Sequence, residues 1–542
     1  MQSSRSTHGI AMMHRIWLSG ALLALSMTAC AAAAQPARHY DVGDVPLWKI
    51  SADLAAGKAT SVAITRAYIA RIERFDASLN AVIRIAPDAL EQAAASDRRR
   101  AAGKALGALD GVPVLFKDNI DAVGMPTTAG SYALLDNVPA TDSEVVRRLR
   151  AAGVVILGKT NTSQFAGFRT KLSFNGSTVG GGPRNPYDRT RSACGSSNGS
   201  AVATAVSFAA AAIGTETSGS IVCPASFTGL VGIKPTIALV SRRGIVPISL
   251  TQDTAGPMTR TVKDAALLLD VMAGTDAADP WTQGADAHRT DYVKALRADA
   301  LAGTRLGVVR SLAGYDERTR PLFDAALRVL SERGAELVEI DPAIFEDLGP
   351  EMRIILLQDF KEDLNAYLAT TPASVKTRTL ADLIAFSKSD PRERMHGVNI
   401  FEDAQATNGG RHDPHYIETL AYAKRKAGQE GIDRALAQYR VSALVTVTTG
   451  PAGPIVPDGT DTGYVVDDRP KGARAPNATN HAAIAGYPHV TVPMGLLNGL
   501  PVGLSFIGTA WADSLLVSLG YAYEQASHER VPPPLESLAA GQ

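Results

Sequence analysis

Short apolar segments alternate with helical segments along this chain, and this alternation restricts the possible folds more than any other feature. Residues 112–116 and 154–157 are apolar runs of the kind found in buried strands. Residues 60–76 and 142–152 instead carry the apolar spacing of helices that face a core. Such alternation is typical of a sheet covered by helices. We therefore expect an α/β fold with helices on both faces of its sheet.

The same pattern continues to the end of the chain without a recognisable linker or internal repeat. Further helices are predicted at 87–102, 201–212, 321–333, 379–387, 416–438 and 513–527, and further strands at 443–447, 490–494 and 502–507. Residues 451–477 are rich in Gly, Pro and Asp and are predicted to form a long surface loop. A length of 542 residues would allow several domains, but the continuity favours one large domain over about 45–530.

The charge balance excludes some classes of partner. Lys plus Arg and Asp plus Glu both total 54, so the chain has no net basic field for nucleic acid or an anionic membrane surface. The sequence also contains neither an H-E-x-x-H motif nor paired Cys and His residues at metal-ligand spacing. We expect no nucleic-acid partner, no metal and no cofactor.

The first 34 residues have the pattern of a secretory signal peptide. Arg5, His14 and Arg15 precede an apolar run at 16–27, and small residues follow at 29–34. The apolar run is too short to span a bilayer, so no stable membrane span is expected. Cleavage after Ala34 would deliver a periplasmic or secreted protein. Lipidation at Cys30, which would anchor a lipoprotein, is the alternative.

Three cysteines are present, too few for a disulfide framework: Cys30, Cys194 and Cys223. The last two lie close in sequence to serine-rich loops. We expect them to be buried free thiols. A bridge between them in an oxidising compartment is the alternative.

Two Gly/Ser-rich loops and one lysine are the candidate chemical groups. The loops are 195–200, which contains Ser196, and 214–220, which ends at Ser220. Lys117 ends the apolar run that begins at residue 112. One glycine-rich loop alone indicates a tight turn. Two serine-bearing loops together with a lysine at a strand end instead suggest a hydrolase that uses serine and lysine.

Two other motifs match well-known patterns. Residues 153–160 fit the phosphate loop G-x-x-x-x-G-K-T, but the four middle residues are apolar and are predicted to be the strand itself, so nucleotide binding is rejected. Residues 195–199 fit the nucleophile elbow G-x-S-x-G, with Ser197 as the nucleophile. The preceding residues, 184–194, are polar rather than strand-like. A Ser-His-Asp α/β-hydrolase that uses Ser197 stays open as an alternative, and its candidate bases are His481, His489 and His528.

Several motifs in order along residues 47–529 resemble those of the amidase signature family. Those motifs are Gly111-Val-Pro-Val-Leu-Phe-Lys117-Asp-Asn, Gly158-Lys-Thr-Asn161, Cys194-Gly-Ser-Ser-Asn-Gly-Ser200, Gly214-Thr-Glu-Thr-Ser-Gly-Ser220-Ile and Ala485-Gly-Tyr-Pro488 with the following 492–503. Within the family, Ser220-Ile-Val-Cys-Pro224 and Gly508-Thr-Ala-Trp511 look most like bacterial peptide amidases. The resemblance implies one large domain with a central mixed β-sheet covered by helices on both faces.

The resemblance also implies a division of roles. Ser220 would be the nucleophile, Ser196 a bridging serine after a cis peptide bond, and Lys117 the base. The backbone N–H groups of Thr217, Ser218 and Gly219, together with that of Ser220, would form the oxyanion hole. A lysine with the usual pKa of about 10.4 accepts no proton near neutrality, so Lys117 must be buried, which lowers a lysine pKa by up to ~3–5 units.

Three positions depart from the commonest family pattern. Ser218 and Asn198 stand where glycine is usual, and Glu216 stands where aspartate is usual. Backbone donors need no particular side chain, so we expect activity to be retained. The segments 280–440 and 451–477 are predicted to shape the substrate pocket.

The expected activity is hydrolysis of a linear carboxamide, foremost the C-terminal amide of a peptide, through an acyl-enzyme and with release of ammonia. Alternatives are a broader acyl- or aryl-amidase, an amidotransferase subunit that supplies ammonia to charged tRNA, and a catalytically inactive binding protein. The amidotransferase role requires partner subunits and a cytoplasmic site, which the export signal argues against. The sequence leaves the oligomeric state open and is compatible with a monomer.

Overall fold

The computed structural model describes residues 40–170, 175–310, 317–455 and 478–535. From Tyr40 onward the described chain forms one compact unit. The predicted signal peptide at 1–34, the alternative lipidation site Cys30 and most of the predicted loop 451–477 lie outside the described residues, so these expectations stay predictions.

A single mixed sheet lies at the centre of the fold. Its eleven strands run in the spatial order β1-β3-β2-β4-β6-β5-β10-β11-β9-β7-β8. Parallel pairs form at β2–β3, β2–β4, β7–β8 and β7–β9, and the remaining neighbours are antiparallel. The strands are β1 Val82–Ile85, β2 Pro113–Lys117, β3 Val155–Thr160, β4 Ala211–Glu216, β5 Val231–Lys234, β6 Thr254–Thr259, β7 Arg305–Val308, β8 Glu336–Glu339, β9 Ala443–Val447, β10 His489–Leu497 and β11 Leu500–Ile507.

The sequence explains why these segments are strands. Every residue of β2, β3, β4 and β9 is buried, as expected for apolar runs covered on both faces. The hairpin between β10 and β11 turns at Asn498 and Gly499, which both have positive φ angles (50° and 81°). An Asn-Gly pair in this conformation is the favoured two-residue hairpin turn, because its twist matches that of the strands.

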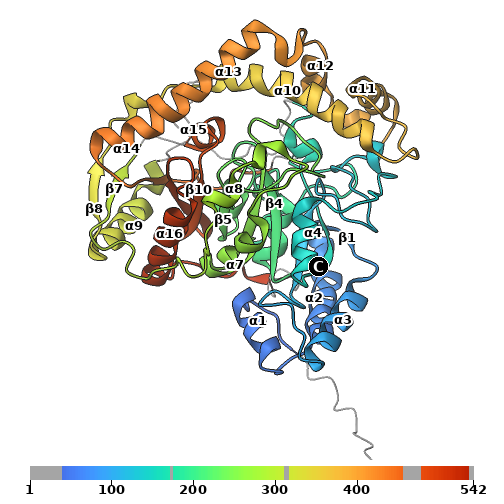
Figure 1. Ribbon diagram of the computed structural model, residues 1–542, viewed down its shortest axis with the longest axis horizontal. Coiled ribbons are helices and arrows are strands. Elements are labelled where there is room, and N and C mark those ends of the chain that lie inside the picture. Colours follow the sequence, from blue (N-terminus) through green and yellow to red (C-terminus); the bar gives the residue numbers. More distant parts are fainter. Residues whose placement is uncertain (1–39, 171–174, 311–316, 456–477, 536–542) are drawn as a thin grey trace, which may run out of the picture. The chain divides into compact units, whose positions relative to one another are not determined.

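Sixteen α-helices are described around the sheet (Figure 1). They are α1 Leu47–Ala55, α2 Ser61–Phe75, α3 Ala89–Ala101, α4 Glu144–Ala151, α5 Asn198–Ala205, α6 Val222–Phe227, α7 Val262–Met272, α8 Ala285–His288, α9 Arg320–Glu332, α10 Gly349–Thr370, α11 Leu380–Ser389, α12 Asn399–Gln405, α13 Pro414–Ala427, α14 Arg434–Tyr439, α15 Ala478–Ala485 and α16 Asp513–Ser527.

Side-chain caps fix where several of these helices begin. The hydroxyls of Ser143 and Thr261 accept hydrogen bonds from backbone N–H groups in the first turns of α4 and α7. Thr379 and Asp382 form a reciprocal capping box at the start of α11. Each cap satisfies backbone donors that a helix N-terminus otherwise leaves unpaired.

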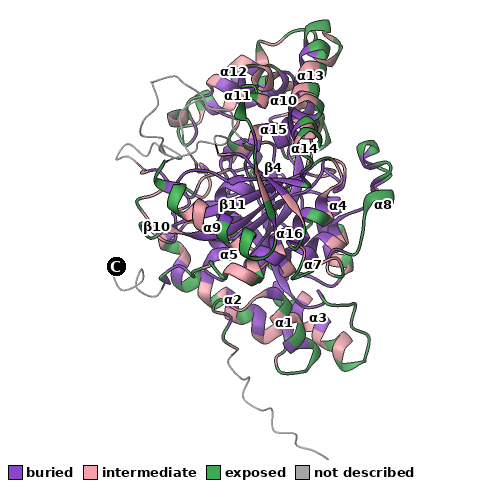
Figure 2. Cartoon of the chain, turned by 90° about the vertical axis from the view of Figure 1, so that its left-hand side faces the viewer, coloured by how far each residue is buried: buried purple, intermediate pink, exposed green. Residues whose placement is uncertain are grey.

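Helices cover both faces of the sheet, as predicted. Successive side chains of a strand point to opposite faces, and β10 shows both environments. Val490 and Val492 lie against Gly520 of α16, whereas Thr491 lies beside Gly232 of β5, on the side of α6. Figure 2 shows the middle of this sheet as buried, whereas the edge strands β1 and β8 contain no buried residue. The mixed α/β architecture expected from the sequence is therefore confirmed.

A helical layer formed by α10–α14 lies beyond one end of the sheet (Figure 1). Within it α10 packs against α12 and α13, and Phe360 of α10 stacks on Phe401 of α12. The predicted helix 416–438 is interrupted, because residues Gly428–Asp433 form a π-helical turn between α13 and α14.

The predicted helix 201–212 is wrong in its second half. α5 ends at Ala205, Ser207 takes a left-handed conformation (φ 59°), and β4 begins at Ala211. Runs of alanine favour a helix locally. Here pairing of β4 with β2 and β6 overrides that preference. The correction matters, because β4 carries the chain from the first serine loop to the second.

None of the helices among the described residues is both long and apolar enough to cross a bilayer.

Candidate active site

Lys117 occupies the last position of β2 and is fully buried (0% exposed). Its Nζ lies 2.8 Å from Ser196 Oγ and 2.9 Å from Thr215 Oγ1, and it also donates to the Thr215 carbonyl at 3.3 Å. β2 and β4 are neighbouring parallel strands, which is why a lysine ending one strand meets a threonine near the end of the other. The structure thus brings Lys117 and Ser196 into hydrogen-bond contact.

The environment of Lys117 favours the neutral amine. Burial lowers its pKa from the usual 10.5 to about 7, and the charges of Asp253 and Glu216 partly oppose this effect. A lysine with a pKa near 7 is able to accept a proton at neutral pH. The burial that the sequence analysis required is therefore present.

The Ser196 backbone is held on the side of β3. The peptide bond between Gly195 and Ser196 is cis, as the family resemblance implied. The Ser196 carbonyl accepts hydrogen bonds from the Ser163 N–H and the Thr162 hydroxyl, each at 3.1 Å. These contacts anchor the serine at the point where its hydroxyl meets Lys117.

Ser220 lies in the loop between β4 and α6 and is 8% exposed. Its carbonyl accepts a hydrogen bond from the Ser197 N–H at 3.2 Å, which joins the two serine loops. No hydrogen bond between the Ser196 and Ser220 hydroxyls is recorded within the described residues. Ser220 is thus held to the neighbour of Ser196 through the backbone, whereas Ser196 contacts Lys117 directly.

Residues 217–220 present backbone donors. Within the described part of the chain, no acceptor is recorded for the N–H groups of Thr217, Ser218, Gly219 or Ser220. Gly219 has a φ of 80°, a conformation that favours glycine, whereas Ser218 has no positive φ. The serine at position 218 therefore fits its backbone without strain, and its hydroxyl donates to Asn480 Oδ1 of α15 at 2.9 Å.

The other two departures from the family pattern also have contacts. Glu216 Oε2 accepts hydrogen bonds from the N–H groups of Ile221 (2.7 Å) and Val222 (3.0 Å), the residues that follow Ser220. Asn198 Nδ2 donates to the Asn175 carbonyl at 2.7 Å. Both side chains therefore hold the serine loops in place.

Ser197 is not arranged as an elbow nucleophile. Its hydroxyl donates to the Thr215 carbonyl at 2.9 Å and accepts from the Thr215 N–H at 3.2 Å. Of the candidate bases, His489 is buried and pairs with Ser505 at 2.6 Å, and burial lowers its pKa to about 3. These contacts favour a structural role for Ser197.

The expectation of two free thiols is wrong. Cys194 and Cys223 form a disulfide, with their Cα atoms 6.0 Å apart. The two cysteines are distant in sequence, but Cys194 precedes the Ser196 loop and Cys223 lies in the first turn of α6, just after Ser220. Their approach follows from the meeting of the two serine loops, which residue spacing does not reveal.

The phosphate-loop pattern at 153–160 is a strand. β3 spans Val155–Thr160 and is buried throughout, as the sequence analysis predicted. Lys159 Nζ donates to the Ile120 carbonyl at 2.6 Å and to Thr127 Oγ1 at 3.0 Å. Its ammonium group therefore makes hydrogen bonds within the protein. The described residues also hold no group of three or more His, Cys, Asp and Glu side chains fit to bind a metal.

Thr215 and Asn119 are two site residues that the sequence analysis did not assign. Thr215 Oγ1 receives hydrogen bonds from Lys117 Nζ (2.9 Å) and from Asn119 Nδ2 (3.0 Å). Both residues lie within the motifs that contain Lys117 and Ser220. Their position beside those residues is the sequence feature that could have assigned them to the site.

Comparison with known proteins identifies the family of this chain. A family model described as Amidase matches residues 63–517. The crystal structure of native peptide amidase from Stenotrophomonas maltophilia superimposes with a TM-score of 0.83 at 43% identity, covering 91% of this chain and 99% of that one.

Similar curated proteins have two kinds of activity. A probable amidase of Arabidopsis thaliana is 36% identical over 494 residues, which is 88% of each chain. A glutamyl-tRNA(Gln) amidotransferase subunit from Acidothermus cellulolyticus is 37% identical over 497 residues, covering 89% of this chain and 94% of its own.

Proposed function

The chain is an amide-hydrolysing enzyme of the amidase family, and we propose that it removes the C-terminal carboxamide of peptides and releases ammonia. The observation that carries the mechanism is the buried Lys117, whose Nζ contacts the Ser196 hydroxyl at 2.8 Å. The observation that supports the substrate is the 43% identity to a peptide amidase over 91% of the chain.

In the proposed acylation step, neutral Lys117 takes the proton of Ser196 as Ser196 takes that of Ser220. Ser220 Oγ attacks the amide carbonyl and forms a C–O bond. The proton then returns through Ser196 to the amide nitrogen, the C–N bond breaks, and ammonia leaves. Water attacks the acyl-enzyme by the same relay and releases the carboxylic acid. The proton transfer requires a hydrogen bond between the two serine hydroxyls. Catalytic hydrogen bonds often tighten only when substrate is bound, so we assign this contact to the substrate complex.

The negative charge of the tetrahedral intermediate requires donors. The backbone N–H groups of Thr217, Ser218, Gly219 and Ser220 are available for this purpose, as described above. Loss of one oxyanion donor in a hydrolase raises the activation free energy by about 3–4 kcal/mol. We assign the oxyanion hole to these groups.

We further propose that the enzyme acts outside the cytoplasm, in the periplasm or after secretion. The support is the signal-peptide pattern of residues 1–34. The disulfide between Cys194 and Cys223 is in keeping with an oxidising compartment.

An amidotransferase subunit is the second candidate, since one such subunit is 37% identical to this chain. A broader acyl- or aryl-amidase is the third. Ammonia release by the purified chain alone separates the first two candidates, because an amidotransferase role would require partner subunits and charged tRNA.

The experiment is a substrate panel with ammonia as the readout for carboxamides. The panel contains peptide amides, the matching peptides with internal amide bonds only, fatty amides and anilides, with aniline release measured for the last. We expect the highest kcat/KM for peptide amides and no cleavage of internal peptide bonds. Turnover of anilides or fatty amides without turnover of any peptide amide would contradict the proposal.

A further inference from the structure

Thr217, the first residue of the oxyanion loop, is held by the two residues that immediately precede β6. Its hydroxyl donates to Asp253 Oδ1 at 2.5 Å, and its carbonyl accepts from Gln252 Nε2 at 3.3 Å. These contacts arise because β6 runs antiparallel to β4, with Thr254 paired with Glu216. The side chain and the main chain of Thr217 are therefore fixed at once.

Asp253 is itself fixed by the loop that precedes it. Its Oδ2 accepts hydrogen bonds from the N–H groups of Ile248 (2.8 Å) and Ser249 (3.0 Å). Downstream of Ile248, the Ser249 hydroxyl donates to Asp359 at 2.6 Å and the Leu250 N–H donates to Asp363 at 2.8 Å. Both acidic residues belong to α10.

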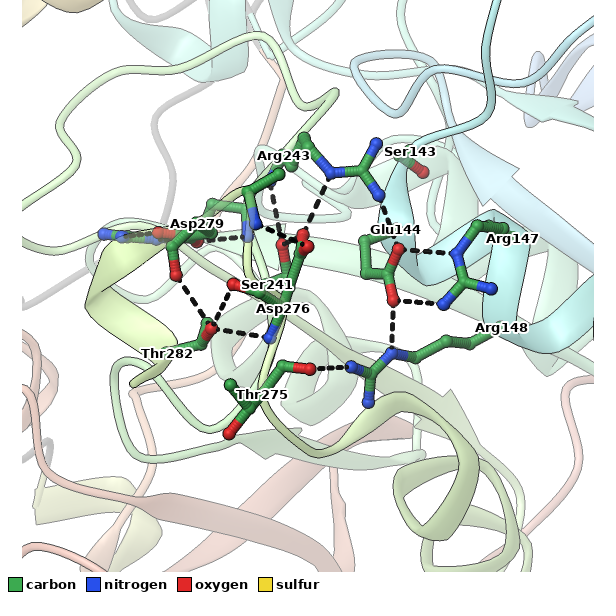
Figure 3. Close-up of polar contacts among 12 residues, drawn as sticks. Ser143, Glu144, Arg147, Arg148, Ser241, Arg243, Thr275, Asp276, Asp279 and Thr282 are labelled. Carbon is green, nitrogen blue, oxygen red and sulfur yellow. Dashed lines mark hydrogen bonds and ion pairs between the residues drawn. The ribbon is translucent and has the colours of Figure 1, made fainter. Parts of the chain in front are cut away.

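Ion pairs hold the beginning of the same loop. Arg243 donates to Glu144 of α4 at 2.5 Å and to Asp276 at 2.9 Å, and Figure 3 shows it between these two carboxylates. The neighbouring Arg242 pairs with Asp279 at 2.8 Å. The segment from Arg242 to Asp253 is thus anchored at both ends, so the position of the Asp253 carboxylate is well defined.

A small pocket lies between Asp253 and the surroundings of Lys117. Its lining includes Asp253, Thr217, Thr215 and Asn119, and Thr215 is the residue that receives hydrogen bonds from Lys117. Asn119 Oδ1 is buried without a hydrogen-bond partner among the described residues. Asp253 is 7% exposed and Lys117 is 0% exposed, so their charges interact with less screening than two charges at the surface.

We propose that Asp253 is a positioning residue for amide hydrolysis. It fixes Thr217 at the start of the oxyanion loop and supplies a negative charge that Lys117 experiences. The proposal rests on the Ser220–Ser196–Lys117 mechanism given above. Asp253 touches neither the substrate nor a reacting atom in that mechanism, and it acts through Thr217 and Lys117.

The charged groups around Asp253 determine the sign of the effect. Arg242 lines the same pocket but is paired with Asp279. Asp363 of α10 is paired with Arg411 at 2.5 Å. Burial, with a smaller contribution from Asp363, raises the pKa of Asp253 to about 7, so this carboxyl group is only partly ionised where Lys117 titrates and the shift caused by its removal is small. Glu216 and Asp253 are the anions that favour protonated Lys117, so removal of the Asp253 charge favours the neutral base.

The test compares pH profiles of peptide-amide hydrolysis for Asp253→Asn, Thr217→Val and Thr217→Ser. In Asp253→Asn we expect kcat to fall by ~10-fold, because displacing an oxyanion donor should lower kcat less than removing that donor completely. The acid limb of the variant's pH profile, where activity falls with falling pH, should move to lower pH by ~0.5 unit. This is less than the ~1–3 units caused by a carboxylate in direct contact. Thr217→Val should lower kcat without moving the acid limb, and Thr217→Ser should keep the activity.

A matched control is Asp264→Asn, which neutralises a buried carboxylate that accepts from the Trp48 N–H in another part of the fold. We expect its acid limb to stay in place. A wild-type kcat and an unmoved acid limb in folded Asp253→Asn would overturn the proposal. Should that variant not fold, wild-type kcat in Thr217→Val would overturn it.

The parallel variant Ser220→Ala separates this inference from the proposed function. An active Ser220→Ala enzyme would overturn the mechanism and this inference with it. An inactive Ser220→Ala enzyme beside an unaffected Asp253→Asn enzyme would overturn the role of Asp253 alone.

Discussion

Lys117 Nζ and Ser196 Oγ lie 2.8 Å apart at a position closed to solvent. The contact joins the end of β2 to a loop that is distant in sequence, and Thr215 at the end of β4 supplies the other described partners of the amine. Oxygen atoms from side chains and backbone thus surround an amine that has no carboxylate among its hydrogen-bond partners in the described part of the chain. This arrangement is suited to a base that works in its neutral form.

Replacement of the lysine tests that role. Lys117→Met keeps most of the side-chain volume and removes the amine, so we expect kcat for peptide amides to fall by ~10³-fold or more. Lys104→Met, at an exposed position, is the matched control and should be as active as the wild type. Circular dichroism and thermal unfolding verify that both variants fold. Near-normal activity in Lys117→Met would show that another group is the base.

The pH dependence follows from the same group. Neutral Lys117 is the reactive form, and its pKa is lowered to about 7. The reactive fraction is therefore large above pH 7 and is lost as the pH falls through 7, so kcat/KM should decrease on the acid side with a midpoint near 7. Initial rates across the pH range provide the measurement. A lysine with an ordinary pKa would instead give a rise that continues to about pH 10.

The disulfide links the two serine loops, so its removal should affect both stability and rate. A bridge between cysteines 29 residues apart contributes about 3.6 kcal/mol to the free energy of unfolding in the chain-entropy model. We expect the double variant Cys194→Ser/Cys223→Ser to unfold at lower denaturant concentration and to have a lower kcat. Reduced and oxidised wild-type protein, compared in the same assay, provide the control. Equal denaturant midpoints for the variant and the wild type would contradict this prediction.

Ser218 tests whether the oxyanion loop depends on side chains. Its hydroxyl donates a hydrogen bond to Asn480, and a hydrogen bond of this kind contributes ~1 kcal/mol to the free energy of unfolding. We expect Ser218→Ala to change kcat by less than ~10-fold, because the donors to the oxyanion belong to the backbone. A double-mutant cycle with Asn480→Ala should give a coupling energy of ~1 kcal/mol. Loss of activity by ~10³-fold in Ser218→Ala would show that the hydroxyl itself takes part in the reaction.

The sequence was sufficient to predict the α/β class and the chemical groups that lie within short motifs. Buried strands such as β9 and the helix α16 coincide with their predicted ranges, because their apolar patterns are unambiguous. Lys117, Ser196 and Ser220 each belong to a loop or strand end with an unusual composition, and their roles follow from the family resemblance.

Other features depend on strand pairing that no local pattern encodes. Asp253 meets Thr217 only because β6 lies beside β4, and Cys194 meets Cys223 only because the serine loops converge. The small residues at 206–212 favoured a helix locally, but position in the sheet made them a turn and a strand. These are the cases in which tertiary context overrides local preference.

The central claim is that Ser220 carries the acyl group, and acyl-enzyme trapping tests it most directly. The enzyme is quenched in acid during turnover of a slowly hydrolysed peptide ester, reduced to open the Cys194–Cys223 bridge, and cleaved after glutamate. Cleavage after Glu216 places Ser220 on a different fragment from Ser196 and Ser197. Mass spectrometry then shows which of the two fragments carries the acyl group. We predict the added mass on the fragment that begins at Thr217, and none in Ser220→Ala. An acyl group on the fragment that contains Ser197 would contradict the mechanism.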